Sequence, residues 1–391
     1  MYSKAFFDEP FDRRGTACEK WDALEERQGR EMNPMWVADM DFRCPGEITE
    51  ALVKRAAHPA YGYTFQTQAA TEAMLAFMQR RHGLSLTAQD QLMLPCVITG
   101  LRAAVLAFTQ PGDKVIVQPP VYGPFYFSVR DNDRAAAECA LIRKDGGRYE
   151  MDLESVERAC KDGAKLMLLC NPHNPVGRAW TKAELTALLR VLACYRVPLI
   201  SDEIHEDFVF EKGAFTPVLT LATEVDASVV SLTSASKTFN LAGLQQAVAL
   251  SRNHGMLRSL EQTMRNVGVV QGNIFGLIAA EAAYRYGDAW LDAMLSYVRQ
   301  GERLLRAELA NRLPKAVLSP LEATYLGWMD LRAYGFTTDQ LMERCRRAGV
   351  EFTPGSFFGQ QAGEGFLRIN LACPHARVID AAKRLEKAVK G

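Results

Sequence analysis

The fold of this chain is decided by the stretch VVSLTSASKTFNLAG, residues 229–243. Its apolar and β-branched residues 229–233 predict a strand, and Lys237 follows that strand between small hydroxyl residues. A lysine at a strand end is packed among neighbours, which suits an amine that forms a Schiff base with a carbonyl cofactor. A lysine near serines is more often a solvated surface residue, so the rest of the chain has to separate these two interpretations.

Apolar runs like residues 229–233 recur earlier in the chain, at 114–117, 166–169 and 198–201. Each is short and is closed by Pro, Asn or Asp, which is the pattern of strands buried on both faces of a parallel sheet. Between them, residues 181–195 predict a helix, because a Thr-x-x-Glu capping box precedes leucines at helical spacing. Residues 152–162 have a similar pattern. This alternation predicts a doubly wound, mostly parallel α/β domain that binds ligands at the carboxyl ends of its strands.

The length of 391 residues predicts two domains, because single hydrophobic cores stop growing below this size. We expect a large cofactor-binding domain over 48–287 and a small α+β domain over 288–391. A turn-rich N-terminal segment, 1–47, is expected to run over the large domain and join the small one. The elements predicted for the small domain are helices near 290–313, 338–348 and 375–389 and strands near 325–329 and 366–370.

The composition describes an ordinary soluble globular protein and argues against several other classes. Hydrophobic residues make up 48% and charged residues 24%, and the net charge is zero, unlike the basic footprint of nucleic-acid-binding proteins. No apolar run approaches the roughly 20 residues of a membrane span, and the first residues, MYSKAFFDEPFDRRG, do not resemble a signal peptide. The nine cysteines form no C-x-x-C pair, which favours free thiols in the cytoplasm.

Polar and aromatic residues follow the predicted strands in order: Tyr122, Asn174, Asp202, His205 and Lys237. Each has an ordinary interpretation by itself, as a packed aromatic, a turn former, a helix cap, a core histidine or a surface cation. Their occurrence at equivalent positions of successive strands argues instead for one shared site.

Pyridoxal 5'-phosphate explains this set economically. Its aldehyde needs an amine, which Lys237 supplies, and its ring nitrogen stays protonated only beside a buried carboxylate such as Asp202. Its phenolic oxygen needs a neutral donor such as Asn174, and its flat ring needs an aromatic face such as Tyr122. We therefore predict pyridoxal phosphate as the cofactor.

The cofactor phosphate needs backbone N–H groups at the start of a helix. The run TGLRAA, residues 99–104, predicts a glycine turn that opens a helix, with Gly100, Leu101 and Arg102 at the phosphate. Ser234 and Ser236 are expected to add hydroxyl donors. No metal is expected, because the H-E-x-x-H pattern that begins at residue 205 has valine in place of its second histidine. Other enzyme classes are disfavoured because the P-loop, G-x-G-x-x-G and G-x-S-x-G motifs are missing.

Together these motifs resemble the fold-type I pyridoxal-phosphate enzymes of aminotransferase class I/II, and within them the cystathionine β-lyase or C–S lyase branch of the MalY and PatB type. The broad family pattern is matched by NPHNPVG at 171–177, SDEIH at 201–205 and SK at 236–237. The branch is indicated by PMWVADMDF at 34–42, YGYT at 61–64, KTFNLAGLQ at 237–245, EATYL at 322–326 and RINLACP at 368–374.

The resemblance implies a role for each cofactor-facing residue. Lys237 is the Schiff-base lysine and Asp202 pairs with the pyridine nitrogen. Asn174 lies near the phenolic oxygen, His205 belongs to the cofactor pocket, and Tyr122 stacks on the ring. Lys237 and Tyr122 are the expected catalytic residues.

The resemblance also implies how the substrate and a second subunit take part. Arg368, with Asn174 and Ala38, would bind the α-carboxylate of an amino-acid substrate, a planar target that suits a guanidinium fork. Tyr61 would reach the phosphate of the neighbouring subunit, which implies a homodimer. Neither a nucleic acid nor a membrane is an expected partner.

The expected activity is β-elimination from cystathionine or a related β-thio amino acid, giving a thiol, pyruvate and ammonia. Many aminotransferases carry an arginine eight residues after the lysine, but this chain has Gln245 there, as the lyase branch does. One hypothesis is that Arg102 partly replaces this cation, and the alternative is that its side chain is directed to solvent. An aminotransferase is the alternative enzyme, and a regulator that binds a transcription activator is the alternative of another class.

Overall fold

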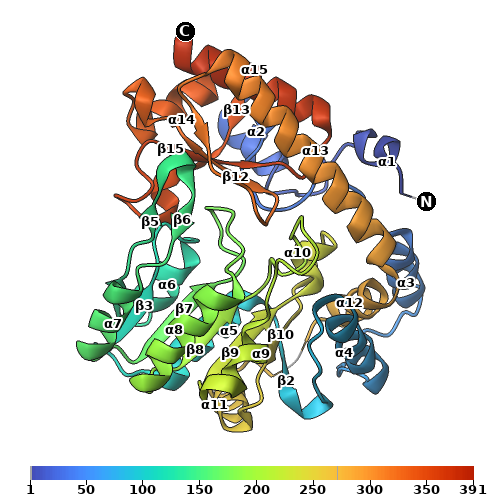
Figure 1. Cartoon of the computed structure of the whole chain (residues 1–391). Coiled ribbons are helices and arrows are strands. Elements are labelled where there is room, and N and C mark those ends of the chain that lie inside the picture. The colour runs from blue at the N-terminus through green and yellow to red at the C-terminus, as the bar shows by residue number, and fades with distance from the viewer. Residues whose placement is uncertain (1, 271) are drawn as a thin grey trace.

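A seven-stranded sheet forms the centre of the large domain in the computed structural model, which describes residues 2–270 and 272–391 (Figure 1). The strand order is β2-β10-β9-β8-β7-β3-β4, and only β10 runs antiparallel to its neighbours. The predicted doubly wound, mostly parallel sheet is confirmed. The strands are β2 Gln91–Leu94, β3 Lys114–Val117, β4 Ala135–Glu138, β7 Leu166–Cys170, β8 Leu199–Asp202, β9 Val229–Thr233 and β10 Ala247–Leu250.

Both faces of this sheet are covered, which explains why its strands are apolar throughout. In β7, Leu166 and Leu168 pack with one set of helices, and Met167 and Leu169 pack with the other set on the opposite face. The first face is covered by α5 Val97–Phe108, α6 Pro124–Arg130 and α11 His254–Asn266. The second is covered by α4 Gln68–His82, α7 Leu153–Lys161, α8 Lys182–Cys194, α9 Val218–Ala222 and α12 Ile274–Tyr286.

The helix predicted over 181–195 begins as its sequence indicates. Thr181 accepts a hydrogen bond from the Glu184 N–H at 3.2 Å, and the Glu184 carboxylate accepts one from the Thr181 N–H at 2.8 Å. This reciprocal pair satisfies two N–H groups that have no partner inside the helix. Four leucines on one face of α8 are fully buried against the sheet.

The C-terminal part, which the sequence predicts to be a small domain, is built on a four-stranded antiparallel sheet of order β11-β12-β15-β14. Helix α13 runs from the large domain up to this sheet (Figure 1). The N-terminal segment joins it through β1, which pairs in parallel with β13. The elements are α13 Asp288–Arg312, β11 Val317–Leu318, β12 Leu326–Asp330, α14 Thr338–Arg347, β13 Val350–Glu351, β14 Thr353–Pro354, β15 Phe366–Asn370 and α15 His375–Lys390.

The remaining elements connect these two parts. Helix α1 packs against α13, and α12 packs against α3 and α4. Within the described residues, no helix is long and apolar enough to cross a membrane. The bounds are α1 Lys4–Asp8, α2 Asp22–Gln28, β1 Asn33–Pro34, α3 Gly46–Ala56, β5 Ile142–Arg143, β6 Tyr149–Glu150 and α10 Ala235–Thr238.

Candidate active site

The predicted cofactor residues lie at the carboxyl ends of three adjacent parallel strands. Cys170, the last residue of β7, is in register with Asp202, the last residue of β8. Asn174 follows β7, and Lys237 lies in the short helix α10 directly after β9. Because β7, β8 and β9 are neighbours in the sheet, their ends meet at one edge, where an α/β fold binds its ligand.

The amine of Lys237 is held inside this edge. Its Nζ donates a hydrogen bond to the Ala38 carbonyl at 2.6 Å. Burial lowers the pKa of Lys237 to about 8, helped by the Arg368 charge and opposed by the Asp39 and Asp202 carboxylates. An amine with a pKa this low is partly neutral near pH 7 and can act as a nucleophile or a base.

Asp202 is buried with little to neutralise it. Its carboxylate accepts one hydrogen bond, from the Ile204 N–H at 3.1 Å, and no ion pair to it occurs among the described residues. Burial raises the pKa of Asp202 to about 7. A carboxyl group in this condition fits a ligand that brings its own N–H or positive charge, as a protonated pyridine ring does.

His205 lies buried beside the same edge. Its ring is 5.9 Å from that of Tyr325 in an edge-on arrangement, and its Nδ1 atom is buried without a hydrogen-bond partner. Burial, together with the Lys237 and Arg368 charges, lowers the pKa of His205 to about 3. A neutral imidazole with an unused ring nitrogen fits a polar ligand in this pocket.

Arg368 is a buried guanidinium with neutral partners only. Its Nη2 donates to the Trp36 carbonyl at 2.7 Å, and its Nη1 lies 3.3 Å from the Asn174 Oδ1 atom. Its Nε has no partner, and no carboxylate lies within ion-pair distance among the described residues. Burial lowers the pKa of Arg368 to about 10. A desolvated cation without a counterion fits the carboxylate of an incoming substrate.

Two aromatic residues shape the space between these groups. Tyr122 is half-buried, and its ring meets that of Phe357 edge-on at 5.9 Å. Burial raises the pKa of the Tyr122 hydroxyl. The Tyr325 hydroxyl donates to the Ala38 carbonyl at 2.9 Å, so this carbonyl holds both Tyr325 and Lys237. Sequence reasoning gave no role to Tyr325 or to the Trp36 carbonyl, although both lie in motifs that marked the lyase branch.

The predicted helix start at Gly100 is wrong. Helix α5 begins one turn earlier, at Val97, and the Gly100 N–H already donates to the Cys96 carbonyl at 3.2 Å. Leu101 and Arg102 therefore also lie beyond the first turn. Gly100 is small for a packing reason, because an added Cβ would lie 2.7 Å from the side chain of Leu94. The open N–H groups at this helix start belong to residues 97–99.

The side chain of Arg102 is paired at the surface, which favours the alternative that it is directed to solvent. Its guanidinium pairs with Asp131 at 2.9 Å, and its side chain is 42% exposed. Ser234 is also committed elsewhere, because its hydroxyl donates to the Gln246 carbonyl at 2.5 Å and caps α10. Ser236 carries no such bond, and the Gln245 side chain turns back to the Ala242 carbonyl at 3.2 Å.

Tyr61 lies on the surface of this chain. It is 57% exposed, and its hydroxyl donates to the Ala56 carbonyl at 2.6 Å. Two further aromatics of the same segment, Tyr63 and Phe65, are 95% and 74% exposed. The role of Tyr61 at a neighbouring subunit stays a prediction.

A lysine of lowered pKa, a buried unpaired carboxyl and a buried guanidinium above a mostly parallel sheet define a pyridoxal-phosphate enzyme of fold type I. The residues present fit this cofactor, since among the described residues His205 Nδ1 and Arg368 Nε are buried without a hydrogen-bond partner and the Asp202 carboxyl accepts a single hydrogen bond. A family model described as aminotransferase class I and II matches residues 38–385. The chain belongs to that family.

The relatives found by comparison include lyases. Cystathionine beta-lyase PatB of Bacillus subtilis is 39% identical over 98% of this chain and 99% of its own length. The structure of cystalysin from Treponema denticola, which contains pyridoxal 5'-phosphate, superposes with a TM-score of 0.94 at 30% identity and covers 98% of both chains. A pyridoxal-phosphate-bound putative aminotransferase from Clostridium difficile 630 has a TM-score of 0.94 and 34% identity over 98% of this chain and 99% of its own. The predicted cofactor is confirmed.

Proposed function

We propose that this chain is a pyridoxal-phosphate-dependent carbon–sulfur β-lyase, which cleaves cystathionine or a related β-thio amino acid into a thiol, pyruvate and ammonia. The observation that carries this function is the similarity to cystathionine beta-lyase PatB over nearly the whole of both chains. The site supports it, because Lys237 offers a partly neutral amine and Arg368 offers a buried cation for an amino-acid carboxylate.

Arg368 and Asn174 fix the substrate by its carboxylate, with the Trp36 carbonyl holding the guanidinium in place. The bound cofactor supplies a carbonyl that joins the substrate amine and a ring that accepts the electron pair from Cα. Asp202 holds the proton on the ring nitrogen, and Tyr122 provides an aromatic wall.

Lys237 moves the proton. Its Nζ removes the Cα proton of the fixed substrate, since a pKa of about 8 leaves part of the amine free to accept it. The thiolate then leaves Cβ and takes up a proton, and the 2-aminoacrylate that remains reacts with one water molecule to give pyruvate and ammonia. Ala38 positions the amine, because its carbonyl accepts a hydrogen bond from Nζ.

The test offers cystathionine to the purified protein with no keto acid present. A lyase releases pyruvate in proportion to thiol, whereas an aminotransferase stops after one turnover because it lacks an acceptor. Lys237→Ala is expected to abolish pyruvate release, and Arg190→Ala, a distant exposed change, serves as the control. Undiminished pyruvate from the lysine variant would remove Lys237 from the mechanism.

We also propose a homodimer in which Tyr61 completes the site of the neighbouring subunit. The exposed aromatic stretch of Tyr61, Tyr63 and Phe65 supports it, because contiguous apolar surface of this kind marks an interface. When Tyr61→Ala chains are mixed with Lys237→Ala chains, each mixed dimer should contain one intact site. Random pairing makes about half of the dimers mixed, so the sample should recover about a quarter of wild-type activity. No recovery after verified subunit exchange would show that Tyr61 serves its own chain.

We place the enzyme in the cytoplasm. All nine cysteines are free thiols in the structure, which suits a reducing compartment. Cell fractionation followed by pyruvate assay tests this, and activity confined to a secreted or periplasmic fraction would contradict it.

A further inference from the structure

A buried charged cluster lies directly behind the turn that carries Lys237. The His82 Nε2 atom is 2.8 Å from the Asp207 Oδ1 atom, and the Thr238 hydroxyl donates to the other Asp207 oxygen at 2.7 Å. Glu206 accepts a hydrogen bond from the Thr233 hydroxyl beside them. The cluster thus connects the end of α4, the loop after β8, and the segment from β9 to α10.

Both side-chain oxygens of Asp207 are hydrogen-bonded inside this cluster. Ligand atoms of His82, Glu206 and Asp207 all lie within 4.8 Å of one another, which is close enough to hold a metal ion. However, both oxygens of Asp207 are already bonded, one to His82 and one to Thr238. The arrangement therefore needs no metal to satisfy Asp207.

The charge of Asp207 is paired inside the protein. A buried carboxylate is costly unless a cation and hydrogen bonds stabilise it. Burial alone would lower the pKa of His82, but the Glu206 and Asp207 carboxylates outweigh it and raise that pKa to about 9. At neutral pH His82 is therefore the cation of this pair.

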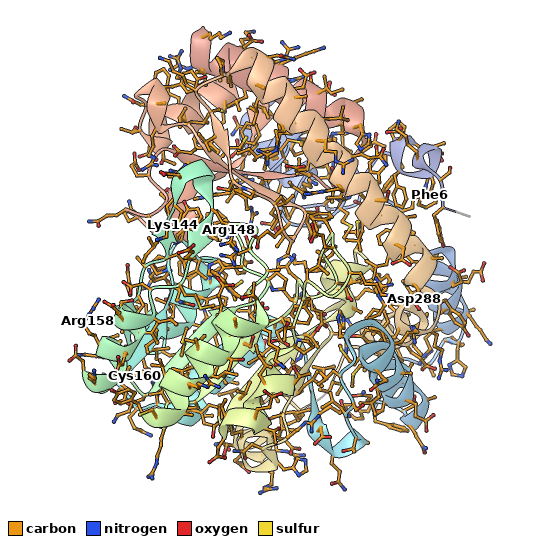
Figure 2. The ribbon with its side chains drawn as sticks, viewed as in Figure 1. Phe6, Lys144, Arg148, Arg158, Cys160 and Asp288 are labelled. Atoms are coloured by element: carbon orange, nitrogen blue, oxygen red, sulfur yellow. The ribbon has the colours of Figure 1, made fainter. Side chains whose placement is uncertain are left out.

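The cluster is also fixed from the outside. It forms the floor of a cavity of about 950 Å³ between the end of α4, the 206–215 loop and α13. At the rim, Arg80 pairs with Asp288 at 2.6 Å, and Arg81 pairs with Asp292 at 2.8 Å. Asp288 is the first residue of α13 (Figure 2), so these pairs fasten the end of α4, and with it His82, to the long helix.

The turn that carries Lys237 depends on such outside support. Helix α10 spans only Ala235–Thr238, and so short a helix is not stable by its own backbone bonds. Thr238 is the residue next to Lys237, is almost fully buried, and makes its side-chain hydrogen bond to Asp207. Loss of this bond would leave a buried carboxylate oxygen unsatisfied and would remove one of the contacts that hold the turn, beside the Ser234 cap of α10.

We propose that His82 and Asp207 are positioning residues for Lys237, which act through the Thr238 hydroxyl to aim the lysine amine at the substrate Cα. This inference rests on the role of Lys237 in the proposed function. Within the described residues, no hydrogen bond joins His82, Asp207 or Thr238 to Arg368 or Asn174, so we expect substrate binding to be separate from this network.

The test compares substitutions of equal size. Thr238→Val keeps the shape but removes the donor, and it should lower kcat about 10- to 100-fold with KM within about twofold. Thr238→Ser restores the hydroxyl and should keep kcat within about threefold of wild type. The matched control is Thr109→Val, which removes another buried hydroxyl, one that donates to the Val105 carbonyl in α5 at 2.5 Å.

A second measurement does not depend on turnover. An amine-reactive reagent modifies Lys237 in protein stripped of cofactor, and mass spectrometry measures the extent of modification. The pH dependence of that modification reports the pKa of the Lys237 amine. If the turn loosens in Thr238→Val, water reaches the amine and its pKa should rise from about 8 toward the ordinary lysine value. Thr109→Val should leave this titration unchanged.

The outcomes separate the possibilities. Unchanged kcat and unchanged Lys237 titration in Thr238→Val would overturn the positioning role. An equal loss of kcat in Thr109→Val would assign the effect to general stability and would also overturn it. If the protein releases no pyruvate at all, the proposed function fails, while the Lys237 titration still decides whether Thr238 controls the lysine.

Discussion

At the scale of single residues, the site keeps groups in conditions that cost stability. Asp202 is a buried carboxyl without a cation in hydrogen-bonding contact, and burial raises its pKa to about 7. Arg368 is a buried guanidinium that forms no ion pair with a carboxylate in the part of the chain that the structure describes. A protein that only needed to fold would not retain either arrangement, and both are relieved when a ligand brings the opposite charge.

Asp202→Asn should therefore stabilise the protein that lacks cofactor. The folded-state pKa lies above the unfolded value of 3.8, so folding is penalised progressively as the pH rises from about 4 through 7. At pH 8 the variant should gain up to about 4 kcal/mol of unfolding free energy, and at pH 4 almost nothing. Urea unfolding at the two pH values checks this, and pyruvate release by the cofactor-loaded variant should fall by at least about 100-fold.

Arg368→Gln tests the carboxylate contact. The change removes a charge-assisted, two-point hydrogen bond worth about 3 kcal/mol, so kcat/KM for cystathionine should fall about 100-fold, mostly through KM. Arg344→Gln is the control. Arg344 is also a partly buried arginine that donates a hydrogen bond to a backbone carbonyl, that of Ala388, but it lies in α14 and not in the candidate site. A normal KM in Arg368→Gln would place the carboxylate elsewhere.

At the scale of elements, sequence reasoning succeeded where local chemistry decides the structure. The capping box at Thr181 predicted the start of α8 correctly, because its partners lie three residues apart. The start of α5 was missed, since the apolar Val97 gives no capping signal and Gly100 is small for packing rather than for a turn. The contact between His82 and Asp207 joins residues 125 positions apart, and no local pattern reports such a contact.

Thr181→Ala measures what the cap of α8 contributes. The substitution leaves the Glu184 N–H without its side-chain acceptor and should cost about 1 kcal/mol of unfolding free energy. Thr181→Ser keeps the acceptor and should lose only a few tenths of that. Denaturant unfolding compares the three proteins, and kcat should stay unchanged because α8 covers the sheet away from the site. A stable Thr181→Ala protein would mean that packing alone sets this helix.

At the scale of the whole molecule, the N-terminal segment ties the two domains to the site. The Trp36 carbonyl accepts a hydrogen bond from Arg368 of the small domain, and the Ala38 carbonyl accepts one from Lys237 of the large domain. In Figure 1 the N-terminal helix α1 lies beside α13, and α2 lies behind the sheet that contains β12. The motif at 34–42 marked the branch in the sequence, but its contribution through carbonyls was not predictable, because backbone groups leave no trace in residue identity.

A buried ion cluster fastens this segment. The Asp41 carboxylate lies 2.9 Å from the Lys20 Nζ, 3.0 Å from Arg377 and 2.8 Å from Arg13. Burial alone would raise the pKa of Asp41, but these cations outweigh it and lower that pKa to about 2. Because the folded-state pKa lies below the unfolded value, the cluster contributes its full stability above about pH 4 and loses it as the pH falls through 2.

Asp41→Asn should release the segment and weaken both carbonyl contacts together. At pH 7 it leaves Lys20 buried beside fewer charges and should cost about 3 kcal/mol of unfolding free energy, a difference from wild type that shrinks as the pH falls toward 2. Limited proteolysis should cut within residues 1–45 first, while kcat falls and KM rises, since Lys237 and Arg368 each lose a partner. Asp12→Asn is the control, because Asp12 is exposed and, among the described residues, its side chain is bonded to Arg14 alone. A loss of kcat with unchanged KM would mean that the segment positions Lys237 only. Arg368 would then be held by its hydrogen bonds to Thr353 and Asn174.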